Sequence, residues 1–304
     1  MKKTILICLV LLYGLRVSRA QSEFPVYIGI HGIKGILHLP EQKGNKFPAI
    51  VTLGGSLGGI KLAELYADSL CKHGYISLSL AYFNYDSLPT QLEEIPLEYF
   101  KKGLDYLLSH PKVDANRIGI LGVSKGAEAA LLIGSYFPEI PVAVAAHMPS
   151  AYVWQGINWD PKSSWKFNNQ PLPFIKYGNG SREDVSQYYI NGLSSADSTE
   201  ITKATIPVEN INGPVLISAG ALDRIWPSAL FSKQIINRLQ EHNFQFNIVH
   251  NFFPKGGHSL FGLFGNIEQY GYVLSNGGSL ENNYNASQLN WKVTLAFFEN
   301  HLRK

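Results

Sequence analysis

Short apolar runs alternate with amphipathic segments along most of this 304-residue chain. Five runs have the length and continuous hydrophobicity of strands buried on both faces, and they lie at residues 49–53, 75–80, 117–121, 142–146 and 214–219. Apolar residues recur at helical spacing from Ala63 to Leu70, and Gly74 ends that helix. The alternation predicts an α/β fold with a mostly parallel central sheet and helices on both faces.

Further elements extend this pattern at both ends of the chain. Two short runs at residues 26–30 and 35–39 flank His31-Gly32 and predict an opening antiparallel hairpin. Pro96 suits the first turn of a helix. We expect helices at residues 96–109, 126–137, 227–241 and 289–302, and one more strand at 246–250.

Residues 150–210 interrupt the alternation. The segment is too long for an ordinary loop, and it contains Trp154, Trp159 and Trp165. One interpretation is a cap over the functional site, because ligands in such folds bind at the carboxyl ends of the strands. The alternative is a surface excursion whose tryptophans pack against the body. We favour a cap-like insertion within one domain that spans residues 21–304.

The first twenty residues have the pattern of a secretory signal. Lys2 and Lys3 precede an apolar run at residues 5–12, and Ser18 and Ala20 supply the small residues that a signal peptidase reads. The alternative is a membrane anchor, but the run is shorter than the roughly 20 residues of a spanning helix. We expect cleavage after Ala20, no stable membrane anchor, and a periplasmic or secreted protein.

Signal removal changes the charge balance. Four of the 26 basic residues and none of the 23 acidic ones lie in the first twenty positions, which leaves 22 basic and 23 acidic residues. This near-neutral balance does not favour nucleic acid as a partner. Only Cys71 remains, so no internal disulfide is possible, and its helical position predicts a buried small apolar residue. No pattern predicts the oligomeric state.

The most informative motif is G-x-S-x-G at residues 122–126, centred on Ser124. It lies between a predicted strand and a predicted helix, where a sharp turn strains the serine backbone and tolerates only small residues two positions away on either side. Such a turn exposes the hydroxyl, and the helix N-terminus favours developing negative charge. A chance glycine pair in a turn is the alternative. The context favours Ser124 as a nucleophile.

A serine hydroxyl needs a base and an acid that orients the base. Of nine histidines, His258 follows the last predicted strand in a glycine-rich loop, whereas most of the others lie at helix ends or before the core. Asp223 lies just past the strand at 214–219, although a helix cap is its alternative role. The order Ser124, Asp223, His258 is that of α/β-hydrolases, and we expect these residues to form a catalytic triad.

An oxyanion hole would need two backbone donors near Ser124. We expect one from Lys125, the next residue, and one from Gly55 or Ser56 in the glycine-rich loop at residues 54–59. A phosphate loop is the competing interpretation, but the segment has neither the Lys-Ser/Thr ending nor G-x-G-x-x-G spacing.

Two further residues are candidates for contact with a substrate. Trp226 follows Asp223 by three positions. His147 follows a core strand and could line the pocket, with a buried core imidazole as the alternative. The sequence has no metal-ligand motif, and no cofactor is implied.

At these residues the chain resembles the catalytic domain of acyl-CoA thioesterases and bile acid-CoA:amino acid N-acyltransferases. The resemblance runs from about Phe47 to the C-terminus, and the segments that carry it are residues 80–89, 97–100, 106–113, 122–128, Trp291 and 297–298. It implies an α/β-hydrolase fold, an acyl ester or thioester as the small-molecule substrate, and Ser124, Asp223 and His258 as the triad.

The chain departs from that family in two ways. Members usually carry an N-terminal β-sandwich domain, but only 26 residues separate Ala20 from Phe47, so we expect that domain to be missing. Transferase members typically use a cysteine nucleophile, and Ser124 favours transfer to water. We therefore expect a serine acyl hydrolase of the thioesterase type, with an N-acyltransferase, an exported carboxylesterase and a non-catalytic binding protein as alternatives.

Overall fold

The computed structural model describes residues 23–29, 32–42, 44–140, 142–157, 160–261 and 276–303. The predicted signal and His31 lie outside these residues. Within them, no helix combines the length and the hydrophobicity that a membrane crossing requires.

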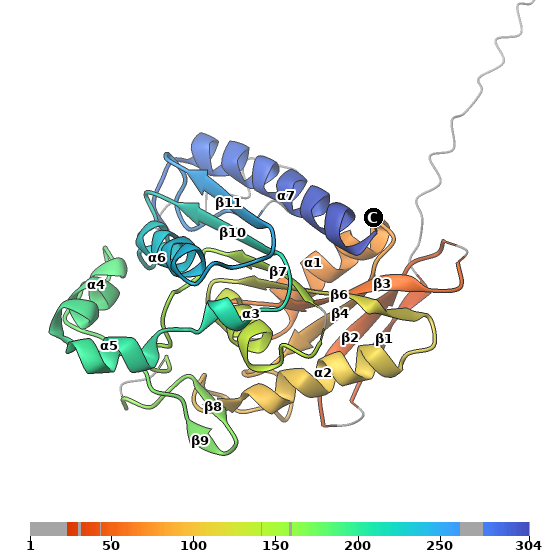
Figure 1. Cartoon of the computed structure of the whole chain (residues 1–304), viewed down its shortest axis with the longest axis horizontal. Helices are drawn as coiled ribbons and strands as arrows, with labels where there is room; N and C mark the ends of the chain where they lie inside the picture. The colour runs from red at the N-terminus through yellow and green to blue at the C-terminus, as the bar shows by residue number, and fades with distance from the viewer. Residues whose placement is uncertain are drawn as a thin grey trace, which may run out of the picture.

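The centre of the molecule is an eight-stranded, mostly parallel sheet (Figure 1). Its strands are β1 (Glu23–Ile28), β2 (Lys34–Leu39), β3 (Phe47–Leu53), β4 (Ile76–Ala81), β6 (Val113–Val123), β7 (Val142–His147), β10 (Val215–Gly220) and β11 (Ile248–Phe253). Their order is β1-β2-β4-β3-β6-β7-β10-β11, and only the pairs β1–β2 and β2–β4 are antiparallel. The predicted opening hairpin and mostly parallel sheet are therefore confirmed.

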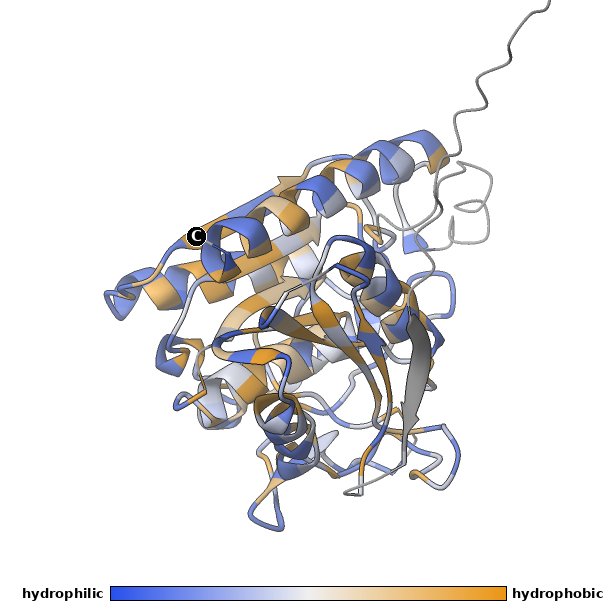
Figure 2. Ribbon diagram, turned by 90° about the vertical axis from the view of Figure 1, so that its right-hand side faces the viewer, coloured by the Kyte–Doolittle hydropathy of each residue, from blue (hydrophilic) through white to orange (hydrophobic). Residues whose placement is uncertain are grey.

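Helices cover both faces of this sheet (Figure 1). They are α1 (Lys61–Lys72) and α7 (Leu280–Leu302) on one face, and α2 (Leu97–Ser109), α3 (Lys125–Tyr136) and α6 (Ser228–Glu241) on the other. Strand side chains alternate between the two cores: Ala49 and Val51 face α2 and α3, whereas Ile50 faces α1 and α7. In Figure 2 the strands have largely apolar colours, and the helices around them carry both apolar and polar colours.

Several predicted boundaries are wrong. The strand predicted at 117–121 is β6 at Val113–Val123, and the strand predicted at 26–30 is β1 at Glu23–Ile28. The last strand, predicted at 246–250, is β11 at Ile248–Phe253. The prediction missed its bounds because most of its side chains are half-buried or exposed and give a weak apolar pattern. The closing helix, predicted from residue 289, begins at Leu280. Its first turns were missed because their buried positions include polar residues such as Asn283 and Ser287. Pro96 is the N-cap of α2 with extended backbone, so it lies just before the first turn.

Residues 150–210 are more regular than the sequence indicates. They contain β8 (Trp165–Phe167), β9 (Gln170–Pro171), α4 (Ser186–Ser195), α5 (Ser198–Ala204) and the 3-10 turn η1 (Val208–Asn210), and β8 pairs with β5 (Ile95–Pro96). Trp154 and Trp165 are fully buried, as the surface-excursion alternative requires, and Trp159 lies outside the described residues. Figure 1 places α4 and α5 on the side toward which β10 and β11 point.

Candidate active site

Ser124 lies in a sharp turn between β6 and α3. The strand ends at Val123, the helix begins at Lys125, and Ser124 itself has φ of 57° and ψ of −120°. A non-glycine residue in such a sparsely populated conformation costs of order 1–3 kcal/mol, and strain of this kind clusters at functional sites. The Ser124 backbone N–H donates to the His147 carbonyl at 2.8 Å, which ties the turn to the end of β7.

The two glycines of the motif are required by backbone contacts. A Cβ on Gly122 would lie 2.0 Å from the carbonyl oxygen of Gly126. One on Gly126 would lie 2.3 Å from the carbonyl oxygen of Gly54. Main-chain atoms cannot withdraw as a flexible side chain can, so this turn fits the strained strand-to-helix geometry that the motif predicts.

Asp223 and His258 are in direct contact. Asp223 Oδ2 lies 2.8 Å from His258 Nδ1, and both side chains are almost fully buried. The backbone N–H groups of Ile225 and Trp226 donate to Asp223 Oδ1, and the Ser228 hydroxyl donates to Oδ2 at 2.6 Å. These bonds fix the carboxylate in a turn before α6, whose N-cap is Pro227, so Asp223 is not the helix cap.

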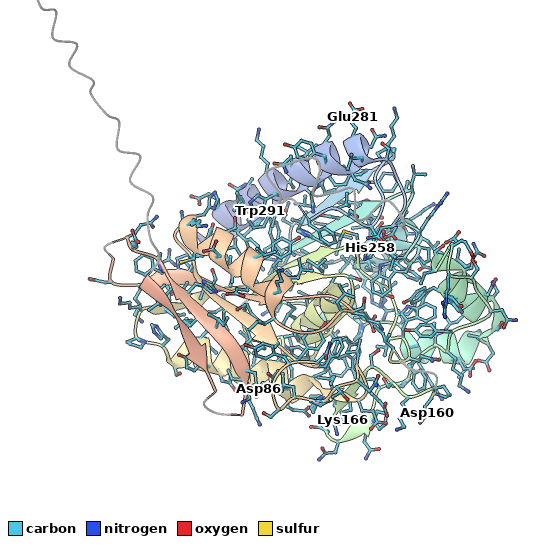
Figure 3. All side chains as sticks on the ribbon, turned by 180° about the vertical axis from the view of Figure 1, so that it is seen from behind. Asp86, Asp160, Lys166, His258, Glu281 and Trp291 are labelled. Atoms are coloured by element: carbon cyan, nitrogen blue, oxygen red, sulfur yellow. The ribbon has the colours of Figure 1, made fainter. Side chains whose placement is uncertain are left out.

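The loop that carries His258 is held by groups that the sequence patterns did not single out. The His258 backbone N–H donates to the Asn276 carbonyl at 3.0 Å, and the neighbouring Gly257 N–H donates to Asn283 Oδ1 at 2.8 Å. Asn283 is fully buried on α7, and no sequence signal separated it from the neighbouring asparagines. Figure 3 shows His258 beneath the end of α7 that carries Glu281.

The glycine-rich loop lies against the candidate nucleophile. A Cβ on Gly55 would be 3.3 Å from Ser124 Cβ and 3.7 Å from Ser124 Oγ. Lys125 and Gly126 occupy the first positions of α3, where N–H groups have no intrahelical acceptor. The structure therefore brings Gly55 and Lys125 to Ser124, while Ser56 follows half-exposed in the same loop.

Trp226 lies between His258 and Lys125, the residue that follows Ser124. Its ring centroid lies 6.3 Å from that of His258 and 6.0 Å from Lys125 Nζ, and its indole N–H donates to the Met148 carbonyl at 3.0 Å. The side chain is 1% exposed. It therefore packs against the candidate base as part of the wall around the site.

His147 takes the position of a core residue. Its ring is fully buried on the α7 side of the sheet, with Nε2 at 3.0 Å from Thr294 Oγ1 and an edge contact to Tyr66. Burial lowers the pKa of His147 to about 3, so the imidazole is neutral. This placement fits the buried-imidazole alternative, and its contact with Ser124 is made by the backbone carbonyl.

A buried ion pair next to Ser124 is a feature that the sequence patterns missed. Lys125 Nζ lies 3.1 Å from Glu128 Oε2, and the two side chains are 1% and 0% exposed. Burial lowers the pKa of Lys125 and raises that of Glu128, and the attraction between the two charges opposes both shifts. Two charges three residues apart in an otherwise apolar helix were the available signal.

Ser124, Asp223 and His258 thus follow the carboxyl ends of β6, β10 and β11, and the mostly parallel sheet with helices on both faces is an α/β-hydrolase fold. Solved structures agree on this fold. A putative dienelactone hydrolase from Klebsiella pneumoniae matches with a TM-score of 0.58 at 17% identity, over 91% of this chain and 98% of that one. An α/β-hydrolase from a deep-sea metagenome library matches with a TM-score of 0.57 at 14% identity, over 94% and 100%.

Residues 95–304 match the family described as BAAT / Acyl-CoA thioester hydrolase C terminal, and the chain belongs to this family. Acyl-coenzyme A amino acid N-acyltransferase 2 of Mus musculus is 29% identical over 89% of this chain and 64% of its own length. Acyl-coenzyme A thioesterase 2, mitochondrial, of Homo sapiens is 33% identical over 72% of this chain and 43% of its own length. The chain thus spans less than two thirds of these relatives.

Proposed function

We propose that this protein is a serine acyl hydrolase that cleaves an acyl thioester or ester with an apolar acyl chain. The observation that carries the proposal is the contact between Asp223 and His258 at the sheet edge where Ser124 is held in strained backbone. The thioesterase relatives support an acyl thioester as substrate.

The proposed reaction has two steps. His258 accepts the Ser124 proton as the hydroxyl oxygen attacks the acyl carbon, and the imidazolium then returns that proton to the departing thiolate or alkoxide. Asp223 fixes the imidazole tautomer and stabilises the imidazolium. The N–H groups of Lys125 and Gly55 stabilise the tetrahedral oxyanion. Water, deprotonated by His258, then attacks the acyl-enzyme, and the imidazolium protonates the departing Ser124 oxygen as the carboxylic acid is released.

The N-terminal pattern bears on where this reaction occurs. Because residues 1–20 resemble a secretory signal, we propose that the mature chain acts outside the cytoplasm. An extracellular ester or thioester would then be a substrate at least as available as acyl-CoA, and both belong in the first assay.

A second candidate function is acyl transfer to an amino acid. The N-acyltransferase relatives favour it, since the mouse bile acid-CoA:amino acid N-acyltransferase is 31% identical over 89% of this chain. In that case the amino group of an amino acid, rather than water, would attack the acyl-enzyme. The products separate the two functions, because only the transferase forms an amide.

The test compares purified wild type with Ser124→Ala on acyl-CoAs and p-nitrophenyl esters of several chain lengths, with and without an added mixture of amino acids. Ser135→Ala is the matched control, because it removes a buried hydroxyl from α3 that donates to the Leu131 carbonyl. We expect wild type and Ser135→Ala to release free acid and Ser124→Ala to be inactive. Activity that survives in Ser124→Ala, or an inactive wild type, would contradict the proposal.

A further inference from the structure

Lys125 and Glu128 form hydrogen bonds with Trp154, Ser164 and Trp165, which all belong to the insertion at residues 150–210. Ser164 Oγ accepts a hydrogen bond from Lys125 Nζ at 2.9 Å. Glu128 Oε1 accepts from the indole N–H of Trp165 at 2.8 Å and from the backbone N–H of Trp154 at 3.2 Å. The first turn of α3 is therefore bound to Trp154, Ser164 and Trp165 through its charged side chains.

The same stretch also reaches the glycine-rich loop. Trp165 packs on Tyr82 with ring centroids 5.7 Å apart, and the Tyr82 hydroxyl donates to the Gly54 carbonyl at 2.7 Å. Gly54 in turn touches Gly126 across the turn that holds Ser124. The cluster of Lys125, Glu128, Trp165 and Tyr82 is therefore next to two backbone segments. These segments contain the Lys125 and Gly55 N–H groups that would donate to an oxyanion.

An ion pair is an unusual way to build such a cluster. Desolvation of two buried charges offsets much of their attraction, and apolar residues of similar volume are often at least as stabilising. Directional bonds from both charges fix orientation in a way that apolar packing does not. The contacts of this pair therefore point to orientation rather than to stability.

We propose that Lys125 and Glu128 are positioning residues: they clamp Trp154, Ser164 and Trp165 onto the turn at Ser124 and so aim the Lys125 backbone N–H at the oxyanion. The proposal rests on the proposed acyl hydrolase function. Its first consequence is kinetic: loss of the clamp lowers kcat while KM changes little, because an oxyanion forms only in the transition state. Its second consequence is structural, since the two clamped segments loosen together.

The central test is the double variant Lys125→Met/Glu128→Met, compared with Lys125→Met and Glu128→Gln alone. Each single variant leaves a buried charge without its partner and is expected to unfold at lower temperature. The double variant removes both charges and is expected to recover most of the unfolding midpoint. Its kcat on p-nitrophenyl acetate should stay about 10- to 100-fold low, below the roughly 100- to 1000-fold effect of deleting an oxyanion donor.

Hydrogen exchange supplies a readout that does not need activity. In the double variant, peptides that cover residues 122–130 and 150–166 should exchange faster together, by more than the peptides of the rest of the protein. Unchanged exchange in both peptides would overturn the clamp, and so would a kcat that recovers with the unfolding midpoint. An inactive wild type would instead contradict the acyl hydrolase, while exchange would still decide whether the clamp exists.

Glu209→Gln is the matched control. Glu209 forms a partly buried ion pair with Arg238 between η1 and α6. Its loss should lower the unfolding midpoint modestly and leave both kcat and exchange near Ser124 unchanged. A kcat loss in Glu209→Gln equal to that of the double variant would overturn the proposal, because it would make the effect a general consequence of lost stability.

Discussion

The Oδ2 atom of Asp223 lies 2.8 Å from Nδ1 of His258, although the two residues are 35 positions apart in the chain. The contact depends on two glycine-rich turns that touch, since a Cβ on Gly220 would lie 2.4 Å from the carbonyl oxygen of Gly257. With Nδ1 facing a carboxylate, Nε2 is the ring nitrogen that remains for proton transfer. In the proposed acyl hydrolase, Asp223 would therefore be the acid that orients His258.

Replacement of Asp223 by Asn should lower kcat by about 10³- to 10⁴-fold with little change in KM, because an amide does not hold the imidazole in the tautomer that accepts the serine proton. Steady-state kinetics on a p-nitrophenyl ester measure this loss. Asp197→Asn is the control: Asp197 caps α5, and Asn is an equally good cap. Equal activity of Asp223→Asn and wild type would refute the role given to Asp223.

Gly126→Ala should reduce activity at least 10-fold and lower the unfolding midpoint. The added methyl group would lie 2.3 Å from the Gly54 carbonyl oxygen, so the turn at Ser124 and the glycine-rich loop must move apart. Kinetics and thermal unfolding of the same preparation test both effects. The matched control is Gly29→Ala, whose methyl group would meet no atom within 4 Å. Normal activity in Gly126→Ala would contradict the geometry described for the turn.

His147 should make the protein less stable in mild acid. Burial lowers its pKa in the folded state to about 3, below the ordinary value of 6.5, so the unfolded chain binds the proton more readily. Its stabilising contribution is complete above pH 6.5 and is lost as pH falls toward 3, by up to about 1.4 kcal/mol per pH unit. His147→Gln should show a shallower decline of unfolding free energy between pH 6 and pH 4. An unchanged slope would contradict a neutral buried imidazole.

The proposed secretory signal at residues 1–20 predicts where the mature protein would begin. After expression of the full-length chain in a bacterial host, the mature form should begin at Gln21, because Ser18 and Ala20 are the small residues before the cleavage site. N-terminal sequencing of the exported fraction identifies it, and Ala20→Tyr should block processing. Recovery of the uncleaved chain in the cytoplasm alone would contradict export.

Local patterns predicted most of the fold because the strands between Ala49 and Ala219 are buried on both faces and read as continuous apolar runs. The same patterns failed where buried positions are polar. The first turns of α7 were not predicted because Asn283 and Ser287 occupy buried positions there. The bounds of β11 were missed because its half-exposed residues do not form a continuous apolar run. Residues 150–210 were hard to interpret because their short elements depend on contacts with the body, such as the pairing of Trp165 with Ile95.

Some residues of the candidate site could also be predicted from local sequence patterns, and others could not. Ser124, Asp223 and His258 were candidates from the sequence because a strand end, a loop and a fixed order point to each of them, and their catalytic roles remain a prediction. Glu128 and Asn283 were not, since their partners are distant in sequence: Glu128 binds Trp165, and Asn283 binds Gly257. A short motif can indicate candidate reactive residues, whereas the residues that pack against them and orient them come from distant parts of the sequence and are identified only in the folded structure.

The measurement that tests the acyl hydrolase most directly is reaction of the purified protein with a fluorophosphonate, followed by mass spectrometry of its peptides. Such probes phosphonylate serines that are activated by a neighbouring base. The account predicts one adduct, on Ser124, that is absent in Ser124→Ala and forms far more slowly in His258→Ala. No adduct in wild type, or an adduct on another residue that persists in Ser124→Ala, would contradict the assignment of Ser124 as the nucleophile.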